Sequence, residues 1–510
     1  MYVLSPEEMK NLDKQTIEYV GIEGIVLMEN AGKKAAEILE LNLLEPHEFI
    51  AVVCGTGNNG GDGLVISRWL HNHNFDVHCY IIGKKEKLSP SAATNYKILN
   101  KLSCPITFIE NGQQLKDYVD ELSCYSTFID ALFGIGLKGE IKGYRNKLVK
   151  IVNQHSQKTI AVDVASGVDC ASGQISNIAI KADYTITMAA IKYGHILYPG
   201  REYSGEVYIV DIGISPETYD RFLPKAEIIE DLDLFISERE ADTTKNDYGR
   251  ISIIAGSRGL TGAAIMSAKS ALEMGSGLIK LIHPSSLSDI FETSLLEVMS
   301  KSVVETEDIS ISPDALSTIL SFVSYSDAIA IGPGISRNQE TASFVREFLK
   351  ENNKSTVIDA DAINAFKDYN QELQKLSGKP YIFTPHIKEF SRLTGIDIDY
   401  VKSNIVKCAH EFAAKYNLVL LLKGSTSIIT DGNKITFNTT GNAGLSTGGS
   451  GDVLSGIIVS LLGQGFNTYD AARIGSFILG KTADIVAENY GEYSTTPSKI
   501  IQNIYKTISS

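Results

Sequence analysis

Cysteine, positive charge and long apolar runs are all scarce in this sequence. Its 510 residues include six cysteines, no two of which have the CxxC spacing typical of metal and redox sites. The formal net charge of −14 disfavours a nucleic-acid partner, because Lys and Arg must neutralise the phosphates. No run approaches the roughly 18 apolar residues of a membrane-spanning helix. We therefore expect a cytoplasmic protein with reduced cysteines that binds neither nucleic acid nor membranes.

The first residues predict a helix rather than an export signal. Ser5 suits the N-cap, Pro6 the first helical position and Glu8 the third, where a carboxylate completes a capping box. The acidic residues Glu7 and Glu8 also break the basic and then apolar pattern of a secretory signal.

Short apolar runs alternate with amphipathic segments almost throughout the chain. The strand-like runs are 49–54, 77–83, 126–134, 158–166, 183–188 and 205–212, followed by 250–257, 277–283, 327–334, 355–362, 380–385 and 418–432. Strands separated by helices predict βαβ units and parallel sheets that are covered on both faces. Because 510 residues exceed what one core usually organises, we predict two α/β domains.

A charged, irregular stretch at 215–240 interrupts this alternation and is the candidate linker. A boundary near residue 225 gives domains 1–225 and 226–510. In the second domain, Asp431-Gly432 stands between two strand-like runs, a pattern typical of a tight hairpin. We therefore expect an antiparallel edge on the second sheet.

A glycine-rich segment follows the strand-like run 49–54. Gly55, Gly57 and Gly60 satisfy GxGxxG, the dinucleotide-binding pattern in which a helix N-terminus receives the pyrophosphate. However, the next strand ends in Lys84-Lys85, where an NAD-dependent dehydrogenase needs an acid for the ribose. A dehydrogenase is therefore the weaker interpretation.

Three longer motifs, NNGGDGL (58–64), FIDALFGIGLKGE (128–140) and AVDVASGVD (161–169), together resemble the YjeF N-terminal family of NAD(P)H-hydrate epimerases. The resemblance implies a Rossmann-like three-layer α/β/α domain with a potassium ion bound by Asn59, Asp130 and Ser166. It also implies that Asp163 is catalytic and lies against the nicotinamide ring. The residues implied to bind this substrate are Asn58, Asn59, Gly60, Gly61 and Asp62 in one loop, Gly134, Ile135, Gly136, Leu137, Lys138, Gly139 and Glu140 in another, and Asp163.

Simpler structural roles are available for several of these residues. Asp62 could cap the following helix, while Asp130 and Asp163 could cap turns. For each residue alone we would favour that role, but the three motifs occur in family order. Asp163 also follows a buried strand, the place where open α/β sheets bind ligands.

A second glycine-rich loop, Gly448-Gly449-Ser450-Gly451-Asp452, leads directly into an apolar helix. It lacks the GK[ST] ending of a Walker P-loop and instead resembles the GxGD loop of ribokinase-like kinases. In those enzymes the backbone N–H groups stabilise the transferred phosphoryl group, and the Asp is the base toward the acceptor hydroxyl. Asp452 is therefore the second catalytic candidate.

Further motifs, including AIGPG (330–334), VIDADAIN (357–364) and TPHIKEFSRL (384–393), resemble the YjeF C-terminal family of ADP-dependent NAD(P)H-hydrate dehydratases. The resemblance implies a ribokinase-like α/β/α domain that uses ADP and Mg²⁺, with Glu389 in the metal-organising signature. The implied substrate-binding residues are Gly334, His386, Ile387, Lys388, Glu389, Phe390, Ser391, Arg392 and Asp452. The implied ADP-binding residues are Lys423, Gly424, Ser425, Thr426, Ser427, Gly448, Gly449, Ser450 and Gly451.

Two points qualify this picture. The family usually reads TPHPGE, whereas this chain has Ile387-Lys388 in place of Pro-Gly, which removes a rigid turn and adds a positive charge. Asp359 and Asp361 precede a short helical pattern, and we expect them to stabilise its start rather than to take part in the chemistry.

Taken together, the motifs predict an enzyme that repairs hydrated nicotinamide cofactors. It would interconvert the R and S hydrates of NADH and NADPH (NADHX and NADPHX). It would then dehydrate the S form at the expense of ADP, releasing AMP and phosphate. The alternative is a ribokinase-like kinase for a vitamin or sugar with a non-catalytic N-terminal binding domain. The sequence leaves open whether the chain forms a homo-oligomer.

Overall fold

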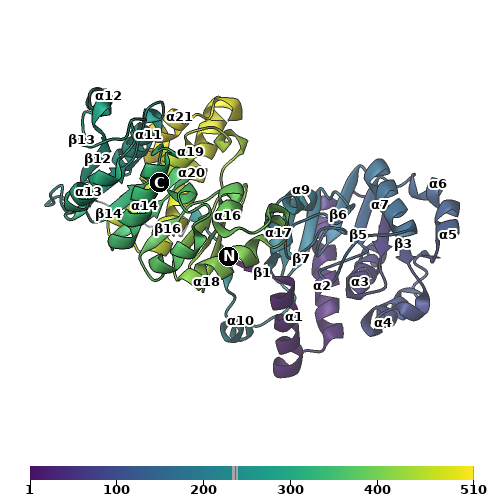
Figure 1. Ribbon diagram of the computed structural model, residues 1–510. Helices are drawn as coiled ribbons and strands as arrows, with labels where there is room; N and C mark the ends of the chain where they lie inside the picture. The colour runs from purple at the N-terminus through teal and green to yellow at the C-terminus, as the bar shows by residue number, and fades with distance from the viewer. Residues whose placement is uncertain (232–235, 237–238, 509–510) are drawn as a thin grey trace. The chain divides into compact units, whose positions relative to one another are not determined.

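A computed structural model describes residues 1–231, 236 and 239–508 (Figure 1). The chain forms two compact units, one of residues 2–225 and the other of residues 226–510 together with Met1. The candidate linker 215–240 falls partly outside the described residues. Its described part is not wholly irregular, because it contains helix α10 (Pro216–Phe222) and strand β10 (Ala226–Ile228).

The N-terminal unit is built on a parallel sheet with the strand order β4-β3-β2-β5-β6-β7-β9. Its strands are β2 (Phe49–Cys54), β3 (Asp76–Ile82), β4 (Ile106–Ile109), β5 (Thr127–Ala131), β6 (Lys158–Val162), β7 (Tyr184–Met188) and β9 (Glu206–Val210). Strands β1 (Tyr2–Leu4) and β8 (Ile191–Lys192) form a separate parallel pair in the same unit. The short strand β4 had no counterpart among the predicted runs.

Helices cover both faces of this sheet, as the alternation along β2 shows. Ile50 and Val52 point into the core formed with α2 (Gly24–Ile38), α3 (Asn58–Asn72) and α4 (Pro90–Leu99). Ala51 and Val53 point into the core formed with α5 (Gly112–Asp117), α6 (Val119–Leu122) and α7 (Tyr144–His155). Because successive strand residues face opposite sides, buried residues at every position of a strand require three layers. The remaining helices are α1 (Pro6–Gln15), α8 (Tyr193–Ile196) and α9 (Gly200–Ser204), with π-helical turns at Thr16–Val20 and Leu39–Leu43.

The start of α1 confirms the predicted capping box. The Ser5 hydroxyl accepts a hydrogen bond from the N–H of Glu8 at 3.1 Å, and the Glu8 carboxylate accepts one from the N–H of Ser5 at 2.9 Å. These bonds satisfy N–H groups that have no acceptor within the helix.

The C-terminal unit carries a sheet with the order β13-β12-β11-β14-β15-β16-β17-β18-β19-β10. Its other strands are β11 (Arg250–Ile254), β12 (Leu278–Pro284), β13 (Met299–Val303), β14 (Ala328–Ile331), β15 (Ser355–Ile358), β16 (Tyr381–Phe383), β17 (Val419–Leu422), β18 (Ser427–Thr430) and β19 (Ile435–Asn438). Only β18 runs against its neighbours among the described strands of this sheet.

The predicted hairpin at Asp431-Gly432 joins β18 and β19 and is confirmed. The Asp431 carboxylate accepts hydrogen bonds from the N–H groups of Asn433 and Lys434, both at 2.8 Å, and Gly432 has a φ of 87°. The expectation of an antiparallel edge was wrong, because β10 pairs in parallel with β19 and places the hairpin inside the sheet.

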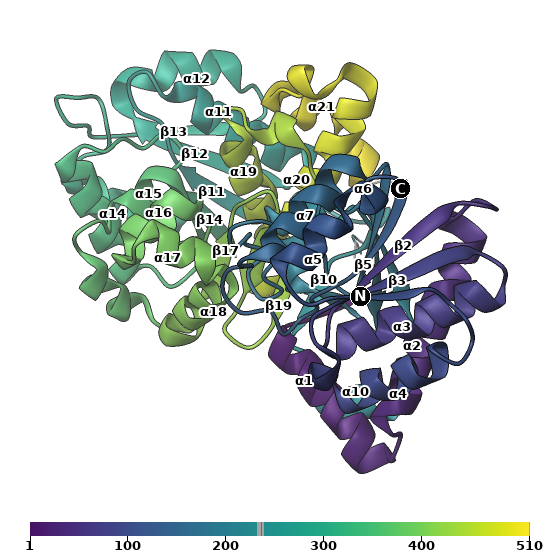
Figure 2. The same ribbon diagram turned by 90° about the vertical axis from the view of Figure 1, so that its right-hand side faces the viewer.

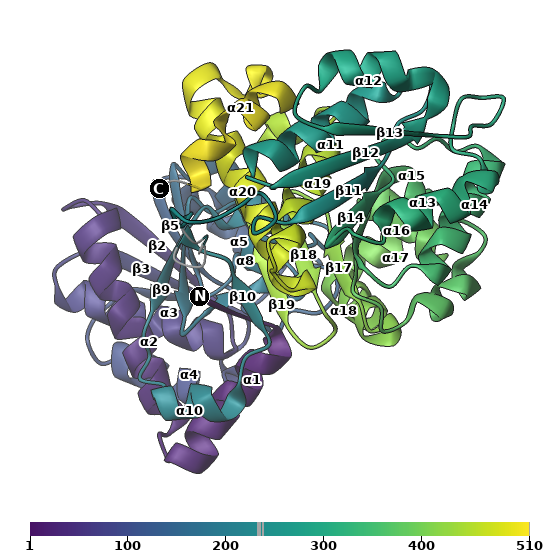
Figure 3. The same cartoon turned by 90° about the vertical axis from the view of Figure 1, so that its left-hand side faces the viewer.

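Two helical layers enclose the second sheet (Figures 2 and 3). One layer contains α11 (Thr261–Glu273), α12 (Ser288–Ser294), α19 (Ser450–Gly463), α20 (Thr468–Tyr490) and α21 (Pro497–Ile508), and it packs on a large apolar core. The other contains α13 (Leu316–Val323), α14 (Gln339–Glu351), α15 (Ala360–Asn364), α16 (Ile387–Thr394), α17 (Ile398–Ser403) and α18 (Ile405–Tyr416). The predicted α/β class, with two domains built on largely parallel sheets, is confirmed.

Two further expectations can be compared with the structure. Among the described helices, none is long and apolar enough to cross a membrane. All six cysteines are free thiols, and Cys124 is the one that is exposed.

Candidate functional sites

The N-terminal unit contains a cavity of about 650 Å³ at the carboxyl ends of β2, β5 and β6. Parallel strands bring the residues that follow them to one edge, which is where α/β sheets bind ligands. The predicted residues that line it are Asn58, Asn59, Asp62, Gly134, Ile135, Gly136, Leu137, Lys138 and Asp163. Gly60, Gly61, Gly139 and Glu140 are not among the lining residues. Glu140 instead lies 3.7 Å from the ammonium group of Lys142.

Residues 58–62 form the first turns of α3 and not a loop, which corrects the prediction. The glycines around them allow backbone segments to pack together. A Cβ on Gly60 would lie 1.9 Å from the carbonyl oxygen of Gly55, and a Cβ on Gly55 would lie 2.0 Å from that of Leu132. This close packing brings the N-terminus of α3, with its unpaired N–H groups, to the cavity. Asp62 is not the cap of α3, because Gly57 occupies the N-cap position.

Asp163 is held by a buried lysine that the sequence motifs did not indicate. The Lys192 ammonium group, whose side chain is fully buried, lies 2.5 Å from Oδ1 of Asp163. It also donates to the hydroxyl of Thr187 and the carbonyl oxygen of Met188, both at 2.7 Å. Asp163 has a φ of 67°, a left-handed conformation that is uncommon for a residue with a Cβ.

Charges around Asp163 determine its ionisation. Burial opposes the charged form, but the ammonium group of Lys192 outweighs it and lowers the pKa of Asp163. His195 accepts a hydrogen bond at Nδ1 from the N–H of Lys192, so its Nε2 donates to the carbonyl oxygen of Asp163 at 2.8 Å. Burial lowers the pKa of His195 to about 4. The site therefore holds an ionised Asp163 and a neutral His195 at neutral pH.

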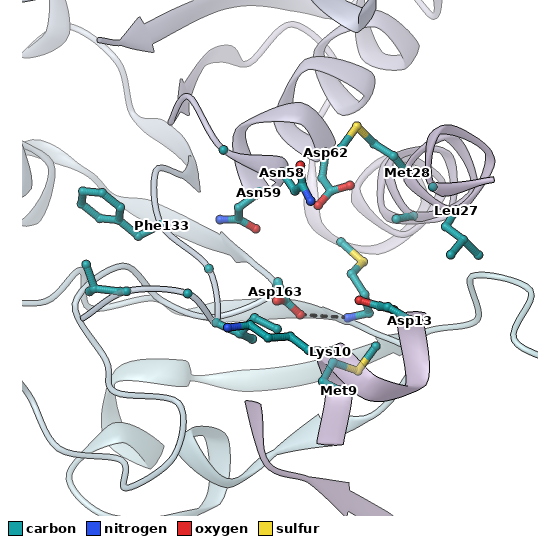
Figure 4. A pocket seen from close by; sticks show the side chains of 18 of the residues that line it. Met9, Lys10, Asp13, Leu27, Met28, Asn58, Asn59, Asp62, Phe133 and Asp163 are labelled. Atoms are coloured by element: carbon teal, nitrogen blue, oxygen red, sulfur yellow. Dashed lines mark hydrogen bonds between the residues drawn. The ribbon is translucent and has the colours of Figure 1, made fainter. Parts of the chain in front are cut away.

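Two more carboxylates, those of Asp13 and Asp62, face the same part of the cavity as Asp163 (Figure 4). Burial raises the pKa of Asp13 to about 6, and the charge of Asp163 adds to this effect. The pKa of Asp62 is also raised, by burial first and by the charge of Asp163 second. Asp13 was missed in the sequence because it occurs in a polar helix remote from every motif, and no local signal marks it.

Asp130 and Ser166 lie together next to this cavity. Oδ2 of Asp130 accepts from the N–H of Ser166 at 2.8 Å, and Oδ1 accepts from the Ser166 hydroxyl at 2.7 Å. Burial raises the pKa of Asp130 to about 6. The third predicted ligand, Asn59, has a buried amide whose oxygen and nitrogen both lack a partner within the described chain. Buried polar atoms are normally hydrogen-bonded, so this amide has an oxygen and a nitrogen available for a bound ion, water or substrate.

In the C-terminal unit, the glycine-rich loop leads into α19. Gly449 is the N-cap with a φ of 105°, a conformation that favours glycine. Ser450, Gly451 and Asp452 form the first turn, where N–H groups have no acceptor within the helix. A Cβ on Gly451 would lie 3.3 Å from the Lys423 ammonium group, so the loop passes directly beside that side chain.

Asp359 lies at the centre of a polar cluster, which corrects its predicted role at the helix start. Its side chain is 2% exposed and makes no capping hydrogen bond to α15. Oδ1 accepts from the Lys423 ammonium group and from the Thr384 hydroxyl, both at 2.8 Å. Oδ2 accepts from the Ser455 hydroxyl at 2.8 Å. Thr384 and Ser455 were not predicted to contribute in this way. Asp361, by contrast, remains in the first turn of α15 and pairs with Arg337.

The cluster adjusts the acidity of Asp452. Burial raises the pKa of Asp452 to about 7, and the negative charge of Asp359 adds to this effect. Burial opposes the charged form of Lys423, but Asp359 outweighs it and raises the pKa of the lysine. A carboxylate whose pKa lies near neutrality is well suited to accept a proton in catalysis.

The segment that carries Ile387-Lys388 begins a regular helix despite its departure from Pro-Gly. His386 caps α16, accepting at Nδ1 from the N–H groups of Lys388 and Glu389 at 3.1 and 3.2 Å. The Glu389 carboxylate accepts from the N–H of His386 at 2.9 Å. This reciprocal capping determines the backbone geometry at the start of α16 without a proline. The side chain of Lys388 is exposed. Burial lowers the pKa of His386.

The other predicted residues of this unit follow adjacent parallel strands. Gly334 follows β14 with a φ of 60° and packs against Leu260 at the start of α11. Lys423, Gly424, Ser425 and Thr426 form the turn from β17 into β18, where Ser427 begins the next strand. Phe390 is buried within α16, while Ser391 and Arg392 continue that helix. The structure thus gathers residues after β14, β15, β16 and β17 at one sheet edge.

The fold and the two polar sites define a two-domain α/β enzyme. Residues 24–194 match the family described as YjeF-related protein N-terminus, and residues 251–506 match NAD(P)H-hydrate dehydratase. The chain belongs to the family of bifunctional NAD(P)H-hydrate repair enzymes and combines epimerase and dehydratase activities. This membership favours cofactor repair over the kinase and dehydrogenase alternatives.

Relatives in the family align over nearly their whole length. A bifunctional NAD(P)H-hydrate repair enzyme from Thermofilum pendens is 33% identical over 100% of this chain and 96% of its own. The enzyme of the same name from Moorella thermoacetica is 34% identical over 96% of this chain and 94% of its own. Among solved structures, a ribokinase-like superfamily protein from Enterococcus faecalis is 25% identical, with a TM-score of 0.49, and covers 56% of this chain and 96% of its own.

Proposed function

We propose that the two activities are divided between the two domains. Residues 1–225 would interconvert the R and S hydrates of NADH and NADPH, and residues 226–510 would dehydrate the S form with ADP. The observation that carries this division is that each domain has its own buried carboxylate site, around Asp163 in one and Asp452 in the other. The reduced cysteines and the anionic substrates are consistent with a cytoplasmic enzyme.

In the N-terminal domain, the hydrated nucleotide would occupy the cavity next to α3. The N–H groups at Asn58 and Asn59 and the loop 134–138 would receive its phosphates and ribose, since helix N-termini favour anions. Asp163, kept ionised by Lys192, would then face the nicotinamide ring. The lining of the cavity supports these assignments, whereas 139–140 are not among its lining residues.

Potassium fits the residues at Asn59, Asp130 and Ser166. The unpartnered Asn59 oxygen and the buried Asp130 carboxylate are oxygen ligands with a local negative charge. A bound potassium ion would supply positive charge that stabilises the ionised Asp130. It would also hold Asn59, and with it the phosphate-binding start of α3, in place.

In the C-terminal domain, Asp452 would accept the proton of the ring hydroxyl as that oxygen attacks the terminal phosphorus of ADP. The bond to AMP breaks, and the N–H groups at Gly449–Asp452 stabilise the charge on the transferred group. Phosphate then leaves the ring carbon, and loss of a proton from the adjacent carbon restores the dihydropyridine. The residues expected around ADP are Lys423–Ser427 and Gly448–Gly451, and those around the hydrated ring are Gly334, 386–392 and Asp452.

Magnesium would enter with the nucleotide, where it neutralises charge on the phosphates. Glu389 would be the carboxylate that faces it, and this assignment is supported by the burial of Glu389 and by the effect of its charge on Lys423. The Lys423 ammonium group, paired with Asp359, would hold the phosphates from the other side.

The absorbance of reduced nicotinamide tests both activities together. The protein is mixed with both epimers of NADHX, ADP, Mg²⁺ and K⁺. A rise that consumes the whole mixture is expected. A rise that stops at the S fraction would contradict the epimerase assignment, and no rise with either ADP or ATP would contradict the dehydratase assignment.

A further inference from the structure

The cavity of the N-terminal domain is lined by three aspartates, and only one of them, Asp163, forms an ion pair with Lys192. Asp13, Asp62 and Asp163 all line it, and the lysines among its lining residues are Lys10, Lys138 and the buried Lys192. If the N-terminal domain is the epimerase, as proposed above, one of these groups must carry the proton that moves during the reaction.

Asp163 is too firmly paired to carry a proton at the start of the reaction near neutral pH. Its Oδ1 accepts from Lys192 at 2.5 Å, from the Thr187 hydroxyl at 3.3 Å and from the N–H of Met188 at 3.4 Å. The lysine is itself anchored to the Met188 carbonyl oxygen. A carboxylate paired in this way is ionised in the resting site, so it can accept the first proton but cannot donate it.

Asp13, unlike Asp163, is not paired with a lysine in the described part of the chain. Its side chain is half-buried, lines the cavity, and makes no hydrogen bond or ion pair with any described residue. The helix that carries it is firmly positioned, because Met9 and Leu12 are buried in the core and Ser5 caps its start. The charged and titratable groups that act on Asp13 or feel its charge are Asp163, Lys192, Asp62 and Tyr219.

We propose that Asp13 is a catalytic residue of the epimerase, the proton donor that works with Asp163 as proton acceptor on the hydrated ring. Burial, together with the negative charge of Asp163, keeps Asp13 protonated to higher pH than an exposed carboxyl. Two carboxyl groups in different environments thus supply one acid and one base, the arrangement that proton exchange requires.

The chemistry balances without any further reactant. Asp163 takes the proton of the ring hydroxyl, a carbon–oxygen double bond forms, and the bond from that carbon to the ring nitrogen breaks. The nitrogen takes the proton of Asp13. After rotation of the open aldehyde, the nitrogen attacks its opposite face and returns a proton to Asp13. Asp163 then protonates the new hydroxyl, which leaves the substrate inverted and both residues in their starting states.

The test is the rate of epimer exchange without ADP, followed by chromatography of NADHX enriched in one epimer. Asp13→Asn is expected to lose on the order of 100-fold or more, the usual size of a general acid's contribution. Asp13→Glu should recover part of the rate. Glu7→Gln is the matched control, because it makes the same carboxyl-to-amide change on an exposed position of the same helix and should exchange at the wild-type rate.

ADP-dependent dehydration of the S form, measured on the same samples, should be equal in all variants. If Asp13→Asn exchanges epimers at the wild-type rate, Asp13 is not the donor. If Asp13→Glu is as inactive as Asp13→Asn while Glu7→Gln exchanges epimers normally, the proposed role of a carboxyl group at residue 13 is also wrong. If the wild-type chain dehydrates the S form but exchanges no epimers, the epimerase assignment itself fails. That result is distinct from the first two.

Discussion

The ammonium group of Lys423 lies 2.8 Å from the Asp359 carboxylate, forming an ion pair at the carboxyl edge of the second sheet. The same carboxylate accepts from two hydroxyl groups, so its position and charge are both well determined. Because Asp359 raises the pKa of the neighbouring Asp452, the pair bears on the proton transfer proposed for dehydration.

Dehydration should depend on pH through Asp452. A base must be deprotonated to act, so the rate is expected to rise as pH increases through about 7 and to level off above it. Asp359→Asn removes the negative charge that opposes ionisation and should move this rise to lower pH. Asp368→Asn, an exposed position in the same domain, should leave the profile unchanged. An identical profile for Asp359→Asn would show that its charge does not act on Asp452.

Asp452→Asn should stop dehydration and spare epimerisation. Removing a general base usually costs on the order of 10²–10⁴-fold in rate. The two rates are measured on one preparation, by nicotinamide absorbance with ADP and by epimer exchange without it. Equal loss of both activities would contradict separate sites in the two domains.

Lys192→Met should destabilise the N-terminal domain, because it leaves the Asp163 carboxylate buried without a partner. Breaking such a pair typically costs about 3–5 kcal/mol. Trp69, the single tryptophan of the chain, lies in this domain, so its fluorescence during urea unfolding reports on this domain. The double variant Asp163→Asn/Lys192→Met removes both partners and should be more stable than Lys192→Met alone.

The loss of stability caused by Lys192→Met should depend on pH. The folded pKa of Asp163 lies below its unfolded value of about 3.9. The pair therefore stabilises the fold fully above that unfolded value and loses its effect as pH falls through the folded one. The difference in unfolding free energy between wild type and Lys192→Met should shrink below about pH 4. A difference that stays constant to pH 2 would argue against an ionised Asp163.

Epimerisation should require potassium. Replacing K⁺ by choline at equal ionic strength should lower the exchange rate, because Asn59 and the buried Asp130 would lose the cation that we propose they share. In Asp130→Ala, replacing K⁺ by choline should not lower the rate of epimer exchange any further. Potassium dependence that persists in Asp130→Ala would place the ion elsewhere.

The sequence predicted the larger elements well and the side-chain partners poorly. Apolar runs such as 49–54 and the first five residues of 158–166 form buried parallel strands, because a strand covered on both faces needs apolar residues at successive positions. Strand β10 was missed because three residues in a charged stretch carry no periodicity, and this omission misplaced the hairpin within the sheet.

In the candidate sites, too, the sequence predicted positions in the fold better than side-chain partners. Glycine-rich loops and strand ends are visible in the sequence, so Asn58, Asn59, Asp163 and Asp452 could be named. Lys192 could not, since only the fold brings it from a different strand to Asp163. Asp359 was assigned to a helix start because its local sequence resembles a cap, while its actual partners lie 25, 64 and 96 residues further along the chain.

The two domains bury separate sets of apolar residues, so damage to one core need not reach the other. A substitution that unfolds the N-terminal domain would then leave a chain that still clears one epimer. Cells that carry such a substitution would slowly accumulate the other epimer. The severity of this partial metabolic defect would depend on how fast the two hydrates interconvert without the enzyme.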